Sequence, residues 1–274
     1  MTPAELQLDE NDPLRILQLS DCHLLEKPGQ KLMGVDTELS FHQVLQHLRS
    51  HSLWPPDLIL LTGDLVQDPF KDNYRRLLQT MDSLNIPWVC LPGNHDSLQL
   101  METILCKKGS HCAKRISSPD WQIICLDSHK ENTHRGHLRQ QELDFLFQCL
   151  SNDPQRTALI ALHHPPIAVG SAWMDTMKLD NGGEFLALVA RFPQVKGIIF
   201  GHVHQVFTAH YGPIPLWSVP STCFQFKPGS KDFALDRLPP GYRWLELYAG
   251  GRLETWVERL EHPPEGLDFL SVGY

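Results

Sequence analysis

Side chains that can bind metal ions follow five apolar runs of this sequence, at the point where each run ends. They are Asp21 and His23, Asp64, Asn94 with His95 and Asp96, His163, and finally His202 and His204. Imidazole and carboxylate ligands suit Mn, Fe or Zn, whereas a structural thiolate zinc site would need cysteines. If the five segments meet, they carry enough ligands for two metal ions.

Each fragment taken alone has an ordinary explanation. The sequence Gly-Asn-His-Asp at 93–96 could be a turn, because Asn tolerates the left-handed conformation that such turns need. His163 and His164 precede two prolines, so they could be core histidines where a strand stops. The G-H-x-H segment is more specific, because alternate residues of an extended chain place both imidazoles on one side. The order and placement of all five fragments together favour a metal site.

The apolar runs are short and continuous, which is typical of strands that are covered on both faces. They span 14–20, 57–63, 88–93, 121–127, 157–164 and 195–201. Segments with helical periodicity lie between them, at 38–50, 73–84, 139–150 and 182–192. Strands that alternate with helices predict an α/β fold. In such sheets ligands bind beyond the carboxyl ends of the strands, where these polar residues stand.

After residue 205 the pattern changes to alternating apolar positions separated by turn residues. We expect antiparallel strands over 205–260 that complete a second sheet. No repeat or long linker divides the chain, so residues 1–274 are predicted to form a single domain. The segment 170–181 is expected to be a loop over one edge.

Composition excludes several classes of protein. The net charge is −8 and the pI is about 6.0, which argues against broad nucleic-acid binding. The N-terminal segment is acidic, without the apolar stretch of a signal peptide, and no run is long enough to span a membrane. The seven cysteines lie mostly in apolar stretches and include no C-x-x-C pair, so we expect buried thiols. These features predict a cytoplasmic protein.

The five fragments, DCH, GD, GNHD, HHPP and GHVH, resemble the signature of the calcineurin-like metallophosphoesterases. The resemblance runs from about residue 14 to the C-terminus. Softer matches, including GVDTELSF, HHPPIAVGSAWMD, VPSTCFQF and PGYRW, are similar to the bacterial class III 3′,5′-cyclic-AMP phosphodiesterases. The family resemblance implies a four-layer α/β/β/α sandwich of two mixed β-sheets flanked by helices.

The resemblance also implies a ligand set for two metal ions, for which Fe and Mn are the leading candidates. One ion would take Asp21, His23 and His204, and the other Asn94, His163 and His202, with Asp64 bridging both. His164 would then support the site from outside or simply pack.

Two ions about 3.5–4 Å apart can hold a hydroxide that attacks phosphorus. Asn94 would bind a metal and touch the phosphate, and His95 would assist the leaving oxygen. Asp96 would orient His95 through its other ring nitrogen. The alternative for Asp96 is an N-cap of a helix that begins near Ser97.

The resemblance places the phosphate of the substrate among residues of the metal site. We predict contacts from His23, Asp64, Asn94, His95, His163 and His204. Trp173 is a weaker candidate, because its ring could stack on adenine or could be a packing anchor. Asn181 could contact the ligand or cap the helix that follows.

The predicted function is hydrolysis of 3′,5′-cyclic AMP to 5′-AMP, which would limit cAMP signalling. An alternative with the same chemistry is a phosphodiesterase or phosphatase for a 2′,3′-cyclic nucleotide, a glycerophosphodiester or a nucleotide pyrophosphate. A phosphoesterase fold kept only as a binding scaffold is disfavoured, because no ligand position is missing. The expected partner is a small cyclic nucleotide, with no nucleic acid or membrane, and the chain would be a monomer or homodimer.

Overall fold

A computed structural model of the chain describes residues 12–106 and 111–273. Its core contains two β-sheets. The first has the strand order β15 (Leu253–Arg259), β14 (Gly241–Leu247), β1 (Leu14–Leu19), β4 (Leu58–Thr62) and β5 (Trp88–Leu91). β1, β4 and β5 run parallel, while β14 is antiparallel to both of its neighbours.

The second sheet has six strands. Their order is β10 (Thr208–Tyr211), β11 (Ile214–Ser218), β9 (Val195–Phe200), β8 (Thr157–Leu162), β7 (Trp121–Cys125) and β6 (Arg115–Ser117). The four inner strands are parallel, and an antiparallel strand closes each edge. Both sheets are therefore mixed, as expected.

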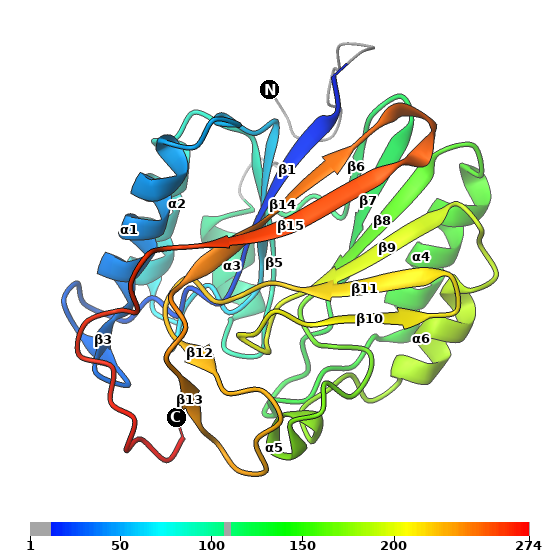
Figure 1. Cartoon of the computed structure of the whole chain (residues 1–274). Coiled ribbons are helices and arrows are strands. Elements are labelled where there is room, and N and C mark those ends of the chain that lie inside the picture. Colours follow the sequence, from blue (N-terminus) through cyan, green and yellow to red (C-terminus); the bar gives the residue numbers. More distant parts are fainter. Residues whose placement is uncertain (1–11, 107–110, 274) are drawn as a thin grey trace.

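Helices cover the outer face of each sheet (Figure 1). α1 (Thr37–Arg49), α2 (Lys71–Asp82) and α3 (Leu98–Ile104) lie beside the first sheet, and α4 (Gln140–Asn152) and α6 (Gly182–Val189) beside the second. Asp36 fixes the start of α1, because its side chain accepts a hydrogen bond from the backbone N–H of Leu39.

Alternate residues of β1 show how the layers are held together. Leu17 and Leu19 pack in a cluster with residues of α1 and α2. Leu14 and Ile16 point to the other face, where they share a cluster with buried residues of β7, β8 and β9. A third cluster joins the second sheet to α4 and α6. Since strand side chains alternate between faces, these clusters confirm the four-layer α/β/β/α arrangement.

The C-terminal strands correct one prediction. β10 and β11 do extend the second sheet, but β14 and β15 complete the first sheet instead, beside β1. The alternating pattern showed that these segments are strands, but it carries no information about which sheet edge they join. The segment 170–181 also contains a short helix, α5 (Ala172–Asp175). Further small elements are β2 (Lys31–Leu32), β3 (Val35–Asp36), β12 (Gln225–Phe226), β13 (Leu235–Asp236) and η1 (Ala249–Gly251).

The cysteines follow the expectation in five of seven cases. Cys22, Cys90, Cys125, Cys149 and Cys223 are buried free thiols. Cys106 and Cys112 instead form a disulfide across a separation of six residues. Their pairing was not predicted, because both were interpreted as small apolar side chains.

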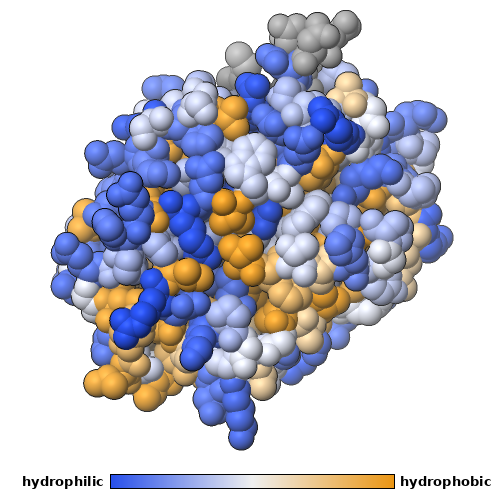
Figure 2. Space-filling model, viewed as in Figure 1, coloured by the Kyte–Doolittle hydropathy of each residue, from blue (hydrophilic) through white to orange (hydrophobic). Residues whose placement is uncertain are grey.

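Figure 2 shows a surface on which hydrophilic and apolar residues are mixed, with apolar residues gathered at the lower left, where Figure 1 draws the C-terminal segment. Phe269, Leu270 and Val272 of that segment are exposed. Within the described ranges, no helix is both long and apolar enough to cross a bilayer.

Candidate metal centre

The carboxyl ends of five strands from both sheets bring the metal-ligating side chains together. β1, β4 and β5 are parallel neighbours in the first sheet, and β8 and β9 are parallel neighbours in the second. Each of these strands is followed within four residues by at least one of the predicted ligands. Because the sheets are stacked face to face, the five loops meet at one edge of the molecule.

The first group of ligands is formed by Asp21, His23 and His204. The Nε2 atoms of His23 and His204 lie 3.1 Å apart, and His204 Nε2 is 3.4 Å from a carboxylate oxygen of Asp21. All three side chains are fully buried. Their ligand atoms converge closely enough to share one cation.

The second group is formed by Asp64, Asn94, His163 and His202. His163 Nε2 lies 3.2 Å from Asp64 Oδ2, 3.2 Å from His202 Nδ1 and 3.3 Å from Asn94 Oδ1. The same Asp64 oxygen is 3.8 Å from His23 Nε2 in the first group. Asp64 therefore stands between the two groups.

Three of the histidines are held through the ring nitrogen that faces away from the cluster. The contacts are His163 Nδ1 with the Thr62 carbonyl at 2.8 Å, His204 Nδ1 with the Phe224 carbonyl at 2.9 Å, and His23 Nδ1 with Gln67 Oε1 at 2.9 Å. An imidazole that donates from Nδ1 in its neutral form keeps a lone pair on Nε2. These contacts turn three lone pairs into the cluster, which is the arrangement that metal-binding histidines use.

The backbone adopts an uncommon conformation at five of the ligand positions. Asp21, His23, Asp64, His202 and His204 all have positive φ, between 45° and 68°. Residues other than glycine rarely adopt this region, and each such position costs about 1–3 kcal/mol. Neighbouring glycines allow the chain to approach closely, since a Cβ on Gly93 would lie 2.2 Å from Asp64 Oδ1. This backbone conformation directs the ligand side chains toward one another.

The charges of the cluster test whether it fits a metal. Among the described residues, the ion-pair partners of Asp21 and Asp64 are histidines only. Burial opposes the charge on His163, but the Asp64 carboxylate beside it raises the pKa of His163 to about 9. Burial lowers the pKa of His23 to about 3. Two buried carboxylates with no Lys or Arg partner in the part of the chain that the structure describes, and with imidazole lone pairs aimed between them, fit metal cations.

His95 lies half-buried at the open side of this cluster. Its backbone N–H donates to Asp64 Oδ1 at 2.9 Å, and its ring Nδ1 donates to the carbonyl of Gln67 at 2.9 Å. The centre of its ring is 5.0 Å from that of His23. These contacts place His95 beside the metal ligands without making it part of the buried set.

Asp96 has neither of its expected roles. The carboxylate accepts hydrogen bonds from the N–H groups of Gly93 and Leu65 and from the hydroxyl of Tyr74. Asp96 was expected to orient the His95 ring, but the ring nitrogen Nδ1 of His95 donates to the backbone carbonyl of Gln67 instead. The N-cap of α3 is Ser97, whose side chain accepts from a backbone N–H, so the capping interpretation of Asp96 is wrong. Asp96 holds the shape of the turn instead.

His134 was missed by the sequence analysis. Its Nδ1 accepts a hydrogen bond of 3.1 Å from the amide of Asn94, and its ring centre is 5.5 Å from that of His95. Desolvation and the neighbouring His95 lower the pKa of His134. The only hint in the sequence was the accumulation of three histidines in SHKENTHRGH at 128–137.

Trp173, His164 and Asn181 each contact other residues of the protein. The Trp173 ring packs edge-on against Phe226, and its N–H donates to Ser230. His164 is buried, with its Nδ1 2.8 Å from the hydroxyl of Ser128. The side chain of Asn181 makes no capping bond to the helix that follows. Trp173 thus has an observed packing role, and its contact with adenine stays a prediction.

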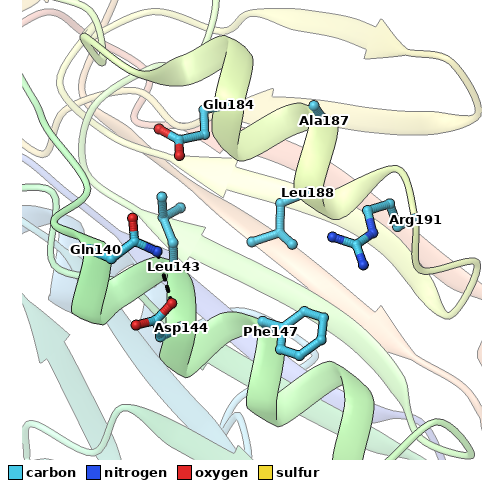
Figure 3. Close-up of a pocket in the computed structure, with 8 residues that line it drawn as sticks. All are labelled: Gln140, Leu143, Asp144, Phe147, Glu184, Ala187, Leu188 and Arg191. Atoms are coloured by element: carbon cyan, nitrogen blue, oxygen red, sulfur yellow. Dashed lines mark hydrogen bonds between the residues drawn. The ribbon is translucent and has the colours of Figure 1, made fainter.

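A separate groove of about 370 Å³ lies between α4 and α6 (Figure 3). Leu143, Phe147 and Leu188 face it, with Glu184 and Arg191 on the same rim. It lies on the outer side of the second sheet, and none of its lining residues belongs to the predicted site.

Residues 14–206 match the family model described as calcineurin-like phosphoesterase, and this chain belongs to that family. The 3′,5′-cyclic adenosine monophosphate phosphodiesterase CpdA of Pseudomonas aeruginosa is 38% identical over 261 residues, which cover 94% of each chain. The protein of that name from Escherichia coli strain K12 is 40% identical over 262 residues, 95% of each chain.

A solved structure of a dimetal phosphatase from Danio rerio shares the fold. It superimposes with a TM-score of 0.60 at 17% identity, covering 90% of this chain and 99% of that one.

Proposed function

We propose that this protein hydrolyses 3′,5′-cyclic AMP to 5′-AMP and thereby limits cAMP signalling. The observation that carries the chemistry is the convergence of Asp, Asn and His side chains from five strand ends into one largely buried cluster. The choice of substrate is supported by two cyclic-AMP phosphodiesterases that are 38% and 40% identical over nearly their whole lengths.

The cluster would hold two metal ions, with Fe and Mn as the leading candidates. Asp21, His23 and His204 would bind one of them, and Asn94, His163 and His202 the other. Asp64 would bridge the two, as its 3.2 Å and 3.8 Å distances to ligands of both groups suggest. When bound, the ions supply an activated water and neutralise charge on the phosphoryl oxygens.

The remaining work falls to side chains at the open edge. Water adds to phosphorus, the bond from phosphorus to the 3′ oxygen breaks, and that oxygen takes a proton. Since Nδ1 of His95 donates to the Gln67 carbonyl, its Nε2 carries the lone pair in the neutral ring, and this nitrogen would take up the proton that the attacking water releases and pass it to the 3′ oxygen. The Asn94 amide, beside His95, can orient the phosphate. His23, Asp64, His163 and His204 would lie close to its oxygens.

The experiment that tests this function is a turnover assay with metal-reconstituted protein. The substrates would be 3′,5′-cyclic AMP, 3′,5′-cyclic GMP, 2′,3′-cyclic AMP and bis-p-nitrophenyl phosphate. We expect 5′-AMP from 3′,5′-cyclic AMP, and loss of this activity with a chelator. Turnover of the 2′,3′ isomer or the artificial diester alone would keep the metal chemistry and refute the signalling role.

We also propose that the enzyme works in the cytoplasm as a monomer or homodimer. Cell fractionation and light scattering of the purified protein test these two points separately.

A further inference from the structure

The segment 127–138 connects β7 to α4 and lies beside the candidate metal centre. It is irregular along its length, yet it carries His134, which contacts Asn94. A loop without its own secondary structure keeps a defined position only through contacts with the rest of the protein. The residues that supply these contacts therefore decide where His134 stands.

One set of contacts comes from Asp180 and Asn181, immediately before α6. The Asp180 carboxylate accepts from Lys130 Nζ at 2.9 Å and from Arg135 Nε at 2.5 Å, one bond to each oxygen. The backbone N–H of Asp180 donates to the carbonyl of Gly136 at 2.7 Å. The Asn181 amide bonds both the N–H and the carbonyl of Leu138. These bonds tie the loop at 130, 135, 136 and 138.

A second set of contacts comes from the buried His164. Its Nδ1 bonds the hydroxyl of Ser128 near the start of the loop. The backbone of Gly136 lies close to the same ring, since a Cβ at this position would be 2.4 Å from His164 Cγ. The loop is thus fixed underneath by His164 and outside by Asp180 and Asn181.

The position of His134 defines what it can contact. Its Nδ1 accepts from Asn94, so in the neutral ring Nε2 carries the hydrogen and is the donor. His134 is exposed, whereas Asn94 and His95 are half-buried between it and the buried ligands. A phosphate at Asn94 and His95 would therefore place the nucleoside part of the substrate, with its hydroxyl and ring acceptors, within reach of His134.

We propose that Asp180 is a positioning residue for substrate recognition, which holds the 127–138 loop so that His134 contacts the nucleoside part of the substrate. This inference rests on the proposed function and adds a specificity element to it. Asp180 itself does not touch the substrate. Its two cations, Lys130 and Arg135, belong to the loop that it fixes.

The matched test compares Asp180→Ala with Asp153→Ala. Asp153 also binds two cations, Arg115 and Arg156, and its side chain is 22% exposed against 21% for Asp180, but it ends α4 and does not contact the loop. For D180A we expect KM for 3′,5′-cyclic AMP to rise about 3- to 10-fold, the worth of one hydrogen bond, with kcat changed less than twofold. Turnover of bis-p-nitrophenyl phosphate, which has no nucleoside, should not change. D153A should match the wild type.

A double-mutant cycle separates positioning from a general structural effect. His134→Ala alone should raise KM about as much as D180A. In the H134A background, D180A should raise KM no further, because the contact it positions is already gone. Asp180→Glu, which keeps both salt bridges within reach, should restore most of the lost affinity. The metal content and the melting temperature of each variant show whether it is folded and carries the same amount of metal as the wild type.

Additive effects of H134A and D180A, or an unchanged KM in D180A, would overturn the proposal. If D180A does not fold, Asp180→Asn, which keeps the shape and the backbone bond to Gly136, gives the same comparison. Failure of the proposed function is distinguishable, because the wild type itself would then not hydrolyse 3′,5′-cyclic AMP.

Discussion

At the scale of single residues, His95 differs from the buried histidines by its place at the open side of the cluster. Its Nδ1 is bonded to the Gln67 carbonyl and its Nε2 is proposed to pass a proton to the leaving oxygen, so replacement removes this proton transfer without removing a predicted ligand. We expect His95→Ala to lower kcat about 10²- to 10⁴-fold while the metal content stays near that of the wild type. Turnover and metal analysis of the same preparation check this.

The exposed His210 offers a control for that variant, since it lies on the edge strand β10. His210→Ala should keep full activity. Near-normal turnover of H95A would remove His95 from the mechanism.

Gln67 supports the site in two separate ways. Its side-chain oxygen accepts from His23 Nδ1, and its backbone carbonyl accepts from His95. Gln67→Ala removes only the first contact, so we expect metal affinity to fall about 10- to 100-fold, because the His23 ring loses its orientation. Metal titration of the chelated protein measures the change. Gln140→Ala, on the outer helix α4, serves as the control, and equal affinities in both variants would refute the role of Gln67.

At the scale of elements, α2 and the turn that follows β5 are joined by one hydroxyl. Tyr74 donates to Asp96 Oδ1 at 3.0 Å and accepts from the Ser97 N–H at 2.8 Å, and Tyr74 and Asp96 are both buried. Tyr74→Phe leaves these polar groups without a partner. We expect unfolding free energy to fall by about 1–3 kcal/mol, measured by urea denaturation.

Tyr248 provides the matched comparison. Its hydroxyl also donates to a carboxylate, that of Glu246, at 2.7 Å, but Tyr248 and Glu246 are only half-buried, whereas Tyr74 and Asp96 are buried. Tyr248→Phe should change stability little, because water replaces the lost bond. Equal losses in the two variants would show that burial of the Asp96 turn is not what makes the Tyr74 bond important.

Strand and helix periodicity predicted most elements to within two or three residues. The strand at 14–20 is β1 over Leu14–Leu19, and the helix at 38–50 is α1 over Thr37–Arg49. The placement of β14 beside β1 could not be predicted, since a pattern of apolar residues identifies a strand but does not indicate which other strand it pairs with. The same limit hid the role of Asp96, whose donors Leu65 and Tyr74 are more than 20 residues away.

At the scale of the whole molecule, the candidate centre joins the two sheets. Asp21, His23, Asp64 and Asn94 follow strands of the first sheet, while His163, His202 and His204 follow strands of the second. Anything that binds only the folded state stabilises it in proportion to its concentration over Kd. Chelation should therefore lower the melting temperature, and adding metal back at about 100 times Kd should restore about 2.7 kcal/mol.

Asp64→Ala tests the bridging position in this experiment. One carboxylate is expected to serve both ions, so the variant should lose metal from both groups and should show no thermal shift when metal is added. Calorimetry with metal analysis checks both points. Full occupancy by two metal ions in D64A would contradict the bridge.

The candidate ligands could be predicted because each stands next to the end of a recognisable strand. His134 and Gln67 could not, since they lie on irregular segments whose positions depend on tertiary contacts such as those of Asp180. The left-handed backbone conformation at Asp21 and His204 could not be predicted either, because an Asp or a His does not by itself indicate this conformation.

The pairing of β1 with β14 limits how early the first sheet can be completed while the chain is being synthesised. β1 is the first strand within the described ranges, yet it lies inside its sheet, and one of its two edges is paired only when residues 241–247 have emerged. Until then the loops after β1, β4 and β5 extend from an unfinished sheet. His202 and His204 also arrive late. The ligand set of the candidate centre is therefore incomplete until residue 204 has emerged, and the first sheet is complete only after residues 241–247 follow.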